Sequence, residues 1–401
     1  MISVDEAWKL IAETLVPLST EEVTVGDVAG RVIAADALSK ITQPPSAVSA
    51  MDGYAVSFRA PIAAGAKFDV VGEAPAGRPF RGEVGDGAVR IFTGSVVPPG
   101  SHHVIIQENV ERDGDVITLL EDQAAARNIR PAGGDFAQGD LLIEAGQRAT
   151  PATASLLAAA GHGSAHVFRR PKVAIFANGD ELVAPGQPLK EGQIYNSVAA
   201  GLVPLFQSWG AEARFVGTAA DRTESVVEVL EKAADADLVV PIGGASVGDY
   251  DVVKQSVHQF FDPVFSKVGV KPGKPVWFSA RGSKAILGLP GNPASAFVCA
   301  HLFGRLAVAK LSGEKGVSNR PTVQATLGAP VEANGAREEF VRATMDWNES
   351  GQLVCTPLPK QDSSLLSTLS KAQGLLRRLS NATSAEAGSS AEVVLFERPR
   401  S

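Results

Sequence analysis

Small and acidic residues follow an apolar run near the middle of the chain. Leu238 to Ile242 is apolar and mostly β-branched, which predicts a buried strand of a parallel sheet. An apolar pattern of helical period comes after the small residues, so a glycine turn separates a strand from a helix N-terminus. Such a turn binds anions, because free N–H groups and the helix dipole converge on it. The turn contributes Gly243, Gly244, Ser246, Gly248, Asp249 and Asp251.

The acids of this turn decide between two interpretations. On its glycines alone, the turn could equally be an ordinary tight connection between a strand and a helix. Carboxylates beside an anion site, as at Asp249 and Asp251, favour a cation between them and the ligand. Mg²⁺ with a phosphate is the commonest arrangement of this kind.

Further polar motifs stand where other predicted strands end. Ligands of doubly wound sheets collect beyond the carboxyl ends of the strands, so these motifs are expected at one sheet edge. They offer carboxylates for a metal, lysines for an oxyanion and glycines that let a ligand approach the backbone. Taken singly, Asp221 is also explained as a helix N-cap, and the lysines as solvated side chains. The residues are Asp180, Glu181, Asp221, Lys271, Lys274, Pro290, Gly291, Asn292 and Pro293.

This set of residues predicts phosphoryl or nucleotidyl transfer, or hydrolysis of a phosphoanhydride. Such reactions depend on positioning and on cations that neutralise developing charge, so they need no covalent nucleophile. The sequence contains no Walker A motif, no G-x-S-x-G elbow and no clustered zinc ligands. Its 6 histidines are scattered, and we interpret each as structural.

The elements that must position these residues alternate between strand and helix from Pro171 onward. This alternation predicts a parallel α/β sheet that is covered on both faces. Short alternating strands fill residues 44–128 and return after Gly313. Ser3 with Glu6 forms a capping box that predicts a helix at the start of the chain.

The fold class is therefore multidomain α/β plus β, and 401 residues are enough for several domains. Residues 1–43 and 129–168 are expected to form a discontinuous, elongated N-terminal domain. Residues 44–128 form an inserted β domain, 169–314 a central doubly wound α/β domain, and 315–401 a C-terminal β domain.

Composition limits the partners and the compartment. The net charge of −7 argues against general binding of nucleic acid, which needs a basic face. No apolar run in the sequence has the length expected of a membrane span. Cys299 and Cys355 lie in apolar runs and are expected to be buried free thiols. We therefore expect a cytoplasmic protein.

Seven segments of the sequence, in this order, closely resemble the molybdopterin molybdenumtransferase family, which includes bacterial MoeA and the gephyrin E domain. The resemblance implies a MoaB/Mog-like central α/β domain and a C-terminal β-barrel-like domain. It also implies a reaction in which molybdate enters the dithiolene of adenylylated molybdopterin, with Mg²⁺-assisted release of AMP. The segments are SAMDGYAV (49–56), IFTGSVVPPG (91–100), NGDEL (178–182), GQIYNS (192–197), GGASVGDYD (243–251), KPGKP (271–275) and GLPGNPASA (288–296).

The resemblance assigns roles to individual residues. It implies that Glu181, Asp221 and Asp251 support Mg²⁺ and that the two lysines, with Arg342 and Ser363, hold molybdate. The glycine turns and Asp180 would bind the pterin substrate. The family is a homodimer, so Asp52 and Thr93 are expected to reach the partner's α/β cleft. The implied protein partners are molybdopterin adenylyltransferase and recipient molybdoenzymes.

Two positions depart from the family pattern. The family usually has Thr where this chain has Asn178, and commonly Asn where it has Val198. Asn retains hydrogen-bonding capacity toward a phosphate or a metal-bound water, whereas Val does not.

Two alternative functions stand beside that of the molybdenum-inserting transferase. A molybdopterin adenylyltransferase shares the GGxS turn, but the additional β domains and SAMDGYA argue against it. A non-catalytic molybdopterin-binding scaffold would be favoured by loss of the acids, yet the acids are present.

Overall fold

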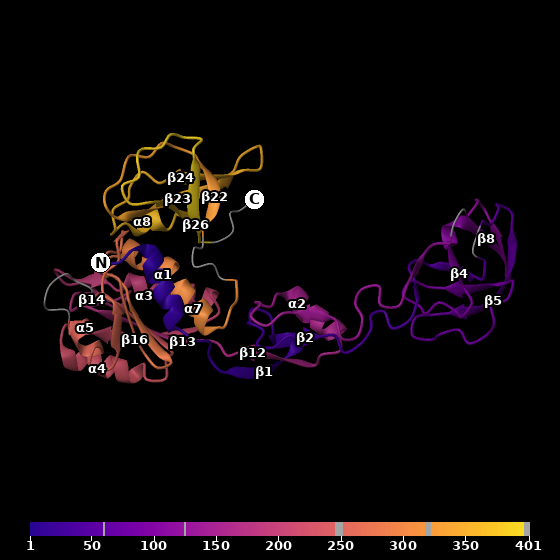
Figure 1. The fold of residues 1–401 in the computed structure, drawn as a ribbon, viewed down its shortest axis with the longest axis horizontal. Coiled ribbons are helices and arrows are strands. Elements are labelled where there is room, and N and C mark those ends of the chain that lie inside the picture. The colour runs from indigo at the N-terminus through magenta and orange to yellow at the C-terminus, as the bar shows by residue number, and fades with distance from the viewer. Residues whose placement is uncertain (59–60, 124–125, 245–251, 317–321, 397–401) are drawn as a thin grey trace.

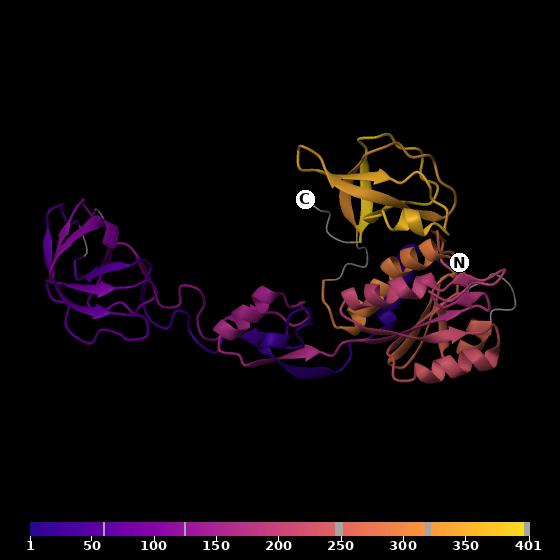
Figure 2. The same cartoon turned by 180° about the vertical axis from the view of Figure 1, so that it is seen from behind.

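The chain is elongated, and its parts lie in a row. The structure, a computed structural model, describes residues 1–58, 61–123, 126–244, 252–316 and 322–396. A small β domain lies at one end, and the α/β domain with the C-terminal domain above it lies at the other (Figures 1 and 2). A slender connecting domain joins these two ends.

The α/β domain is built on a six-stranded sheet in the order β16-β13-β17-β21-β20-β18. The first four strands are parallel, and every residue of β17 is buried, as the apolar run predicted. β20 is antiparallel to β21 because Gly282 and Ser283 join them as a tight hairpin, which was not expected from the sequence, and β18 is antiparallel to β20. The strands are β13 (Lys172–Asn178), β16 (Glu212–Ala219), β17 (Leu238–Ile242), β18 (Asp262–Phe265), β20 (Trp277–Arg281) and β21 (Lys284–Gly288).

Helices cover both faces of this sheet. One face packs against α1, α3, α6, η3 and α7, and the other against α4 and α5. Their bounds are α1 (Val4–Thr14), α3 (Ser197–Ser208), α4 (Thr223–Lys232), α5 (Val252–Val257), α6 (Pro293–Cys299), η3 (Ala300–Gly304) and α7 (Arg305–Leu311).

The first helix lies in the α/β domain rather than in the elongated domain, where the sequence had placed it. Ser3 caps α1, because its side chain accepts a hydrogen bond from the Glu6 N–H, as predicted. The buried face of α1 belongs to the α/β core, and Trp8 Nε1 donates to the Leu302 carbonyl at 2.8 Å. The amphipathic pattern predicts that this helix packs on something, but it does not identify the partner.

The helical run Pro293–Leu311 is long and apolar enough to cross a membrane by length and composition. No run of that length was expected from the sequence. In the structure, 83% of the relevant window is buried inside the protein, which is typical of a core helix.

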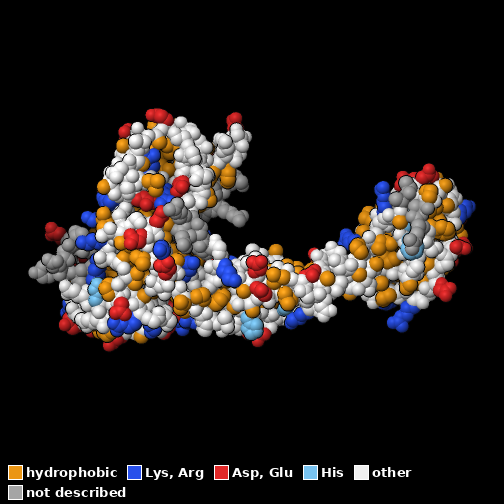
Figure 3. Space-filling view, viewed as in Figure 1, with side chains coloured by type: hydrophobic (Ala, Val, Ile, Leu, Met, Phe, Trp, Pro, Cys, Tyr) orange, Lys and Arg blue, Asp and Glu red, His pale blue; other side chains and the backbone are white. Residues whose placement is uncertain are grey.

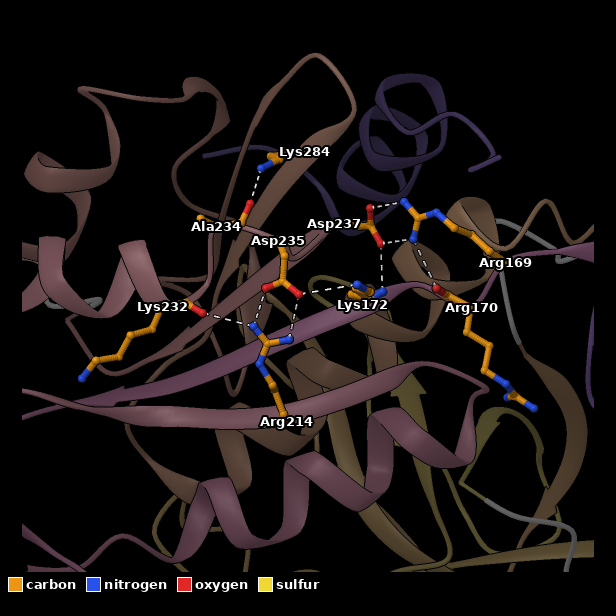
Figure 4. A network of polar contacts seen from close by, with 9 residues as sticks. All are labelled: Arg169, Arg170, Lys172, Arg214, Lys232, Ala234, Asp235, Asp237 and Lys284. Carbon is orange, nitrogen blue, oxygen red and sulfur yellow. Dashed lines mark hydrogen bonds and ion pairs between the residues drawn. The ribbon is translucent and has the colours of Figure 1, made fainter. Parts of the chain in front are cut away.

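Hydrogen bonds and ion pairs between charged side chains connect the amino ends of the parallel strands (Figure 4). Arg169 donates two hydrogen bonds to Asp237, at 2.7 and 2.6 Å, and the Lys172 N–H donates to the same carboxylate at 2.8 Å. Arg214 pairs with Asp235, and this contact lowers the pKa of Asp235 to about 2. We call Arg169, Lys172, Arg214, Asp235 and Asp237 the amino-edge network.

The elongated connecting domain combines a helix with three short strand pairs. Its core contains Val28, Ile33, Leu157 and Val167. Pro151 opens its helix, and Thr150 forms a capping box with Thr153. The elements are β1 (Thr20–Thr24) with β12 (Ser164–Phe168), β2 (Ala37–Leu38) with β11 (Leu141–Ile143), η1 (Val25–Asp27) and α2 (Pro151–Ala159), and the third pair, β3 (Val48–Ser49) with β10 (Ile129–Arg130), lies at the junction with the inserted β domain.

The inserted β domain forms separate apolar cores from residues between Ala47 and Ile129. Its sheet has the strand order β7-β4-β6-β5-β9-β8. The elements are β4 (Gly53–Val56), β5 (Lys67–Ala74), β6 (Ala88–Ile91), β7 (His103–Ile106), η2 (Gln107–Asn109), β8 (Val110–Asp113) and β9 (Val116–Leu119).

The C-terminal domain is a closed five-stranded barrel, because β25 pairs with both β26 and β23. The sequence predicts four of these strands but misses β25, whose letters GLLRR lack alternation. β19 of the α/β domain extends the sheet beside β23. The elements are β19 (Val270–Lys271), β22 (Val323–Leu327), β23 (Glu338–Trp347), β24 (Leu353–Pro357), α8 (Leu366–Leu369), β25 (Gly374–Arg378) and β26 (Ser390–Leu395).

Candidate functional site

Three turns meet in close backbone contact at the carboxyl edge of the α/β sheet. The Gly243 N–H, just after β17, donates to the Leu289 carbonyl at 3.1 Å. Gly243 has φ +90°, and a Cβ there would lie 2.7 Å from the Asn178 carbonyl oxygen. A Cβ on Gly291 would lie 3.5 Å from Gly243 Cα. The turns after β13, β17 and β21 therefore form one surface, and Gly243 has no room for a side chain.

The acidic part of this edge is organised by Asn178, the last residue of β13. Its Nδ2 donates to the Asp221 carboxylate, and the Asp221 N–H donates to Asp180 Oδ1 at 3.4 Å. The carboxylates of Asp180, Glu181 and Asp221 belong to exposed residues. The edge thus presents oxygen ligands from the turns after β13 and β16.

Asp221 is not the N-cap of the next helix, so the simpler interpretation was wrong. Arg222 occupies the N-cap position of α4 and makes no side-chain capping bond. Ser225 Oγ accepts the Ala220 N–H at 3.0 Å instead. Because Asn178 engages the carboxylate of Asp221, that group faces β13 rather than its own helix.

Glu181 folds back over the turn that follows β13. A Cβ on Gly179 would lie 2.4 Å from Glu181 Oε2, so this close approach requires glycine. The Glu181 carbonyl accepts the Ile194 N–H at 2.9 Å, beside the ribbon formed by β14 (Leu182–Val183) and β15 (Ile194–Tyr195). Within the described ranges, no three Asp, Glu, His or Cys side chains form a group that could hold a metal ion by themselves.

Part of the glycine turn lies outside the described residues. Ser246, Gly248, Asp249 and Asp251 belong to this part. The expected grouping of Asp251 with Glu181 and Asp221 therefore stays a prediction.

The loop that carries Lys271 and Lys274, here called the lysine loop, packs against α6, the helix that follows GLPGNP. A Cβ on Gly273 would lie 2.3 Å from Cys299 Sγ of α6, so this glycine permits the contact. Lys271 Nζ pairs with Glu339 of β23 at 2.8 Å, and the lysine side chain is 54% exposed. Lys274 is exposed. Glu339 was not anticipated as a partner of Lys271, although it lies on the same strand as Arg342.

The barrel contributes Ser363 to the same region. Asn292 Nδ2 donates to Ser363 Oγ at 3.2 Å, and the Ala294 N–H donates to the Ser363 carbonyl at 2.9 Å. These contacts join the start of α6, which Pro293 opens, to the Gln361–Ser364 loop. The structure thus brings Asn292 and Ser363 together.

Arg342 lies behind this loop rather than in open solvent. It is fully buried and donates to Gln361 Oε1 at 3.2 Å and to the Asp362 carbonyl at 2.9 Å. Burial lowers its pKa, and Nη2 has no hydrogen-bond partner among the described residues. Arg342 therefore supports the loop that carries Ser363.

Asp52 and Thr93 form a separate polar pair in the inserted β domain. The Thr93 N–H and Oγ1 each donate to Asp52 Oδ1 at 2.7 Å. The backbone bond from Thr93, followed by its hydroxyl bond, lowers the pKa of Asp52. Asp52 directly precedes β4, which lies at the opposite end of the molecule from the α/β sheet (Figure 1). One chain alone does not bring this pair to the carboxyl edge.

Two other features lie apart from this edge. Val198 is 6% exposed and belongs to the apolar core beneath α3, so it presents no polar group there.

A pocket of about 660 Å³ lies between α3, α6 and the barrel, and His301 and Phe396 are among the residues that line it. None of the site residues predicted from the sequence lines this pocket.

Three family models match consecutive parts of the chain. The MoeA N-terminal region (domain I and II) matches residues 2–161, and a probable molybdopterin binding domain matches residues 174–310. The MoeA C-terminal region (domain IV) matches residues 324–396.

Individual relatives match along most of their length. A molybdopterin molybdenumtransferase of Haemophilus influenzae is 34% identical over 92% of this chain and 93% of its own. Molybdopterin molybdenumtransferase 2 of Mycobacterium tuberculosis is 32% identical over 94% of this chain and 95% of its own. The crystal structure of a molybdopterin biosynthesis MoeA protein from Pyrococcus horikoshii superposes with a TM-score of 0.81, at 28% identity, over 98% of this chain and 100% of that one. The three matched regions, the carboxyl-edge geometry and these relatives agree: the chain is a transferase of molybdenum cofactor biosynthesis that belongs to the molybdopterin molybdenumtransferase family.

Proposed function

We propose that this transferase inserts molybdate into the dithiolene of adenylylated molybdopterin and releases AMP in a Mg²⁺-dependent step. The observation that carries the proposal is that acidic and basic side chains occupy different parts of the carboxyl edge. Exposed carboxylates follow β13 and β16, whereas the lysine loop and Ser363 lie beside α6. Glycine turns in backbone contact lie at the same edge.

The residues of the acidic part fit a hard cation. Asp221 and Glu181 supply exposed carboxylate oxygens, which Mg²⁺ prefers, and Asp251 is expected to join them. A cation held there would supply charge neutralisation at the phosphoanhydride oxygens. Asn178 holds the carboxylate of Asp221 in place through its N–H.

The lysine loop fits an oxyanion. Lys271 already binds one carboxylate, that of Glu339, and the ammonium is about half exposed. An ammonium has three donor hydrogens, so Lys271 can bind an oxyanion from the solvent side and keep Glu339, whose side chain is 18% exposed. Lys274 and Ser363 add hydrogen-bond donors, and molybdate accepts such bonds through its oxygen atoms.

The test follows AMP release from adenylylated molybdopterin with molybdate and Mg²⁺. Asp221→Ala should slow AMP release while the pterin substrate stays bound. Lys271→Ala or Lys274→Ala should raise the molybdate concentration required by roughly ten- to a hundredfold, which corresponds to one charge-assisted hydrogen bond. Lys9→Ala, on α1 and 68% exposed, is the matched control and should behave as wild type. Lysine variants with wild-type molybdate dependence would show that the two parts of the site are assigned incorrectly.

We further propose that the active form is a homodimer in which Asp52 and Thr93 serve the partner's carboxyl edge. The distance between the inserted β domain and the sheet supports this, as does the exposed apolar surface along the connecting domain (Figures 1 and 3). Leu38 and Leu141 pair across β2 and β11 and are 50% and 49% exposed.

Mixing two inactive variants tests the shared site. Asp52→Ala and Asp221→Ala should each be inactive, and subunit exchange between them should restore part of the AMP release through hybrid dimers. Light scattering gives the mass of each sample. Exchanged dimers that remain as inactive as their parents would contradict the shared site, and a monomeric active enzyme would contradict the dimer.

A further inference from the structure

A buried amide group stands beside the acidic part of the site, and one of its two polar atoms is unpaired. Asn178 is 8% exposed, and its Nδ2 donates to the Asp221 carboxylate. Its Oδ1 is buried and has no hydrogen-bond partner in the described part of the chain. A buried carbonyl oxygen without a partner destabilises a fold, because folding removes its hydrogen bonds to water. Stability alone therefore does not account for an amide at this position.

The carboxylate of Asp221 determines which way this amide faces. A flipped amide would place Oδ1 against a carboxylate, and both groups only accept hydrogen bonds. Asp221 makes no capping bond to α4, so the bond from Asn178 is the side-chain contact that orients its carboxylate.

The position of β13 explains why this residue can act on the site. β13 lies between β16 and β17 in the sheet, so its carboxyl end is flanked by the turn that carries Asp221 and the turn that carries Gly243. The Asn178 carbonyl oxygen lies 2.7 Å from where a Gly243 Cβ would stand, so the residue is in close contact with the second turn as well. A side chain anchored at this point links the acidic turn to the sheet itself.

We propose that Asn178 is a positioning residue for Mg²⁺: its Nδ2 holds Asp221 in the orientation that binds the cation. Its unpaired Oδ1 accepts a hydrogen bond from a water molecule of the cation when the site is loaded. The inference rests on the proposed function, in which Asp221 supports Mg²⁺. Residues that orient metal ligands typically change metal affinity by about 10- to 100-fold when they are removed.

The experiment is a calorimetric titration of the full-length protein with MgCl₂ in the presence of AMP, together with thermal unfolding of the same samples. Asn178→Leu has similar volume but no polar atoms. It should weaken Mg²⁺ binding by roughly 10- to 100-fold and leave the unfolding temperature unchanged or higher, because the unpaired oxygen is gone. Asn178→Thr keeps a donor and an acceptor, so its affinity should stay within about threefold of wild type.

The Mg²⁺ affinity is the readout that a purely structural role of Asn178 would not move. A merely structural Asn178 predicts lower thermal stability with unchanged Mg²⁺ affinity in Asn178→Leu, and that result overturns the inference alone. A wild-type protein that binds no Mg²⁺, yet releases AMP without it, overturns the Mg²⁺ part of the proposed function as well.

Discussion

Arg377 joins the C-terminal barrel to the first helix through a buried ion-pair cluster. Its side chain is 3% exposed and contacts Glu338 at 2.5 Å, Asp5 at 3.0 Å and Glu392 at 3.2 Å. Its guanidinium also lies over the Trp8 ring, 5.4 Å from the centroid. Burial lowers the pKa of Arg377, but the hydrogen bond and charge of Glu338 together with the charges of Asp5 and Glu392 raise it on balance.

The exposed fractions of the three acids predict which ion pair contributes most to the stability of the fold. The Glu338 side chain is 9% exposed, whereas those of Asp5 and Glu392 are 40% and 41% exposed. Arg377→Met would leave the Glu338 carboxylate buried without its cation, which destabilises a protein by about 3–5 kcal/mol. Glu392→Gln removes only an exposed partner and should cost less than about 1 kcal/mol.

Native-state hydrogen exchange is the appropriate assay, because unfolding of a multidomain chain is not two-state. Exchange in peptides from α1 and β25 should accelerate by roughly two to nearly four orders of magnitude in Arg377→Met, using about 1.4 kcal/mol per factor of ten. The double variant Arg377→Met/Glu338→Leu should recover most of this protection, because two apolar side chains replace the buried pair. Equal effects of Arg377→Met and Glu392→Gln would refute the argument from burial.

Two other predictions use buried groups near the sheet. Burial, with a smaller effect of the Arg305 charge, lowers the pKa of His301 to about 3, whereas an unfolded histidine titrates near 6.5. The unfolded chain therefore binds the additional proton, and stability is lost as the pH falls below about 6.5. Between pH 7.5 and pH 5, wild type should lose roughly 2 kcal/mol more than His301→Phe in the opening free energy that hydrogen exchange reports for peptides of η3, and equal losses would contradict a neutral buried imidazole. Gly243→Ala should destabilise the protein by about 1–3 kcal/mol more than Gly282→Ala, because both glycines have positive φ but only Gly243 meets backbone within 3 Å. Equal unfolding temperatures for these two variants would show that the turns at the edge can separate.

The sequence predicted the features that depend on local pattern. The all-apolar β17 and the Ser3 cap follow from residue types within a few positions of one another. The carboxyl edge was also predictable, because parallel strands place the turns that follow them at one edge. Cys299 and Cys355 are free and buried, as expected.

The features that the sequence missed depend on contacts between distant segments. The packing of α1 on the α/β core and the pairing of Lys271 with Glu339 join residues that no local pattern relates. β25 was not predicted because it contains a buried arginine, Arg377. Its burial is possible only through ion pairs with acids from three other segments. Asp221 has the sequence context of an N-cap, and only the approach of Asn178 across the sheet gives its carboxylate a different partner.

The amino-edge network and the carboxyl edge divide one sheet into regions with different tolerance to mutation. Arg169, Lys172 and Asp237 hold the start of the strands by bonds that involve no residue of the predicted site (Figure 4). Substitutions there should lower the amount of folded protein in a cell while the surviving molecules keep their specific activity. Substitutions at Asp221 or Lys274 should lower the specific activity while the amount of folded protein stays unchanged. In a saturation screen that measures abundance and activity separately, the two ends of the same strands should form two distinct populations of variants.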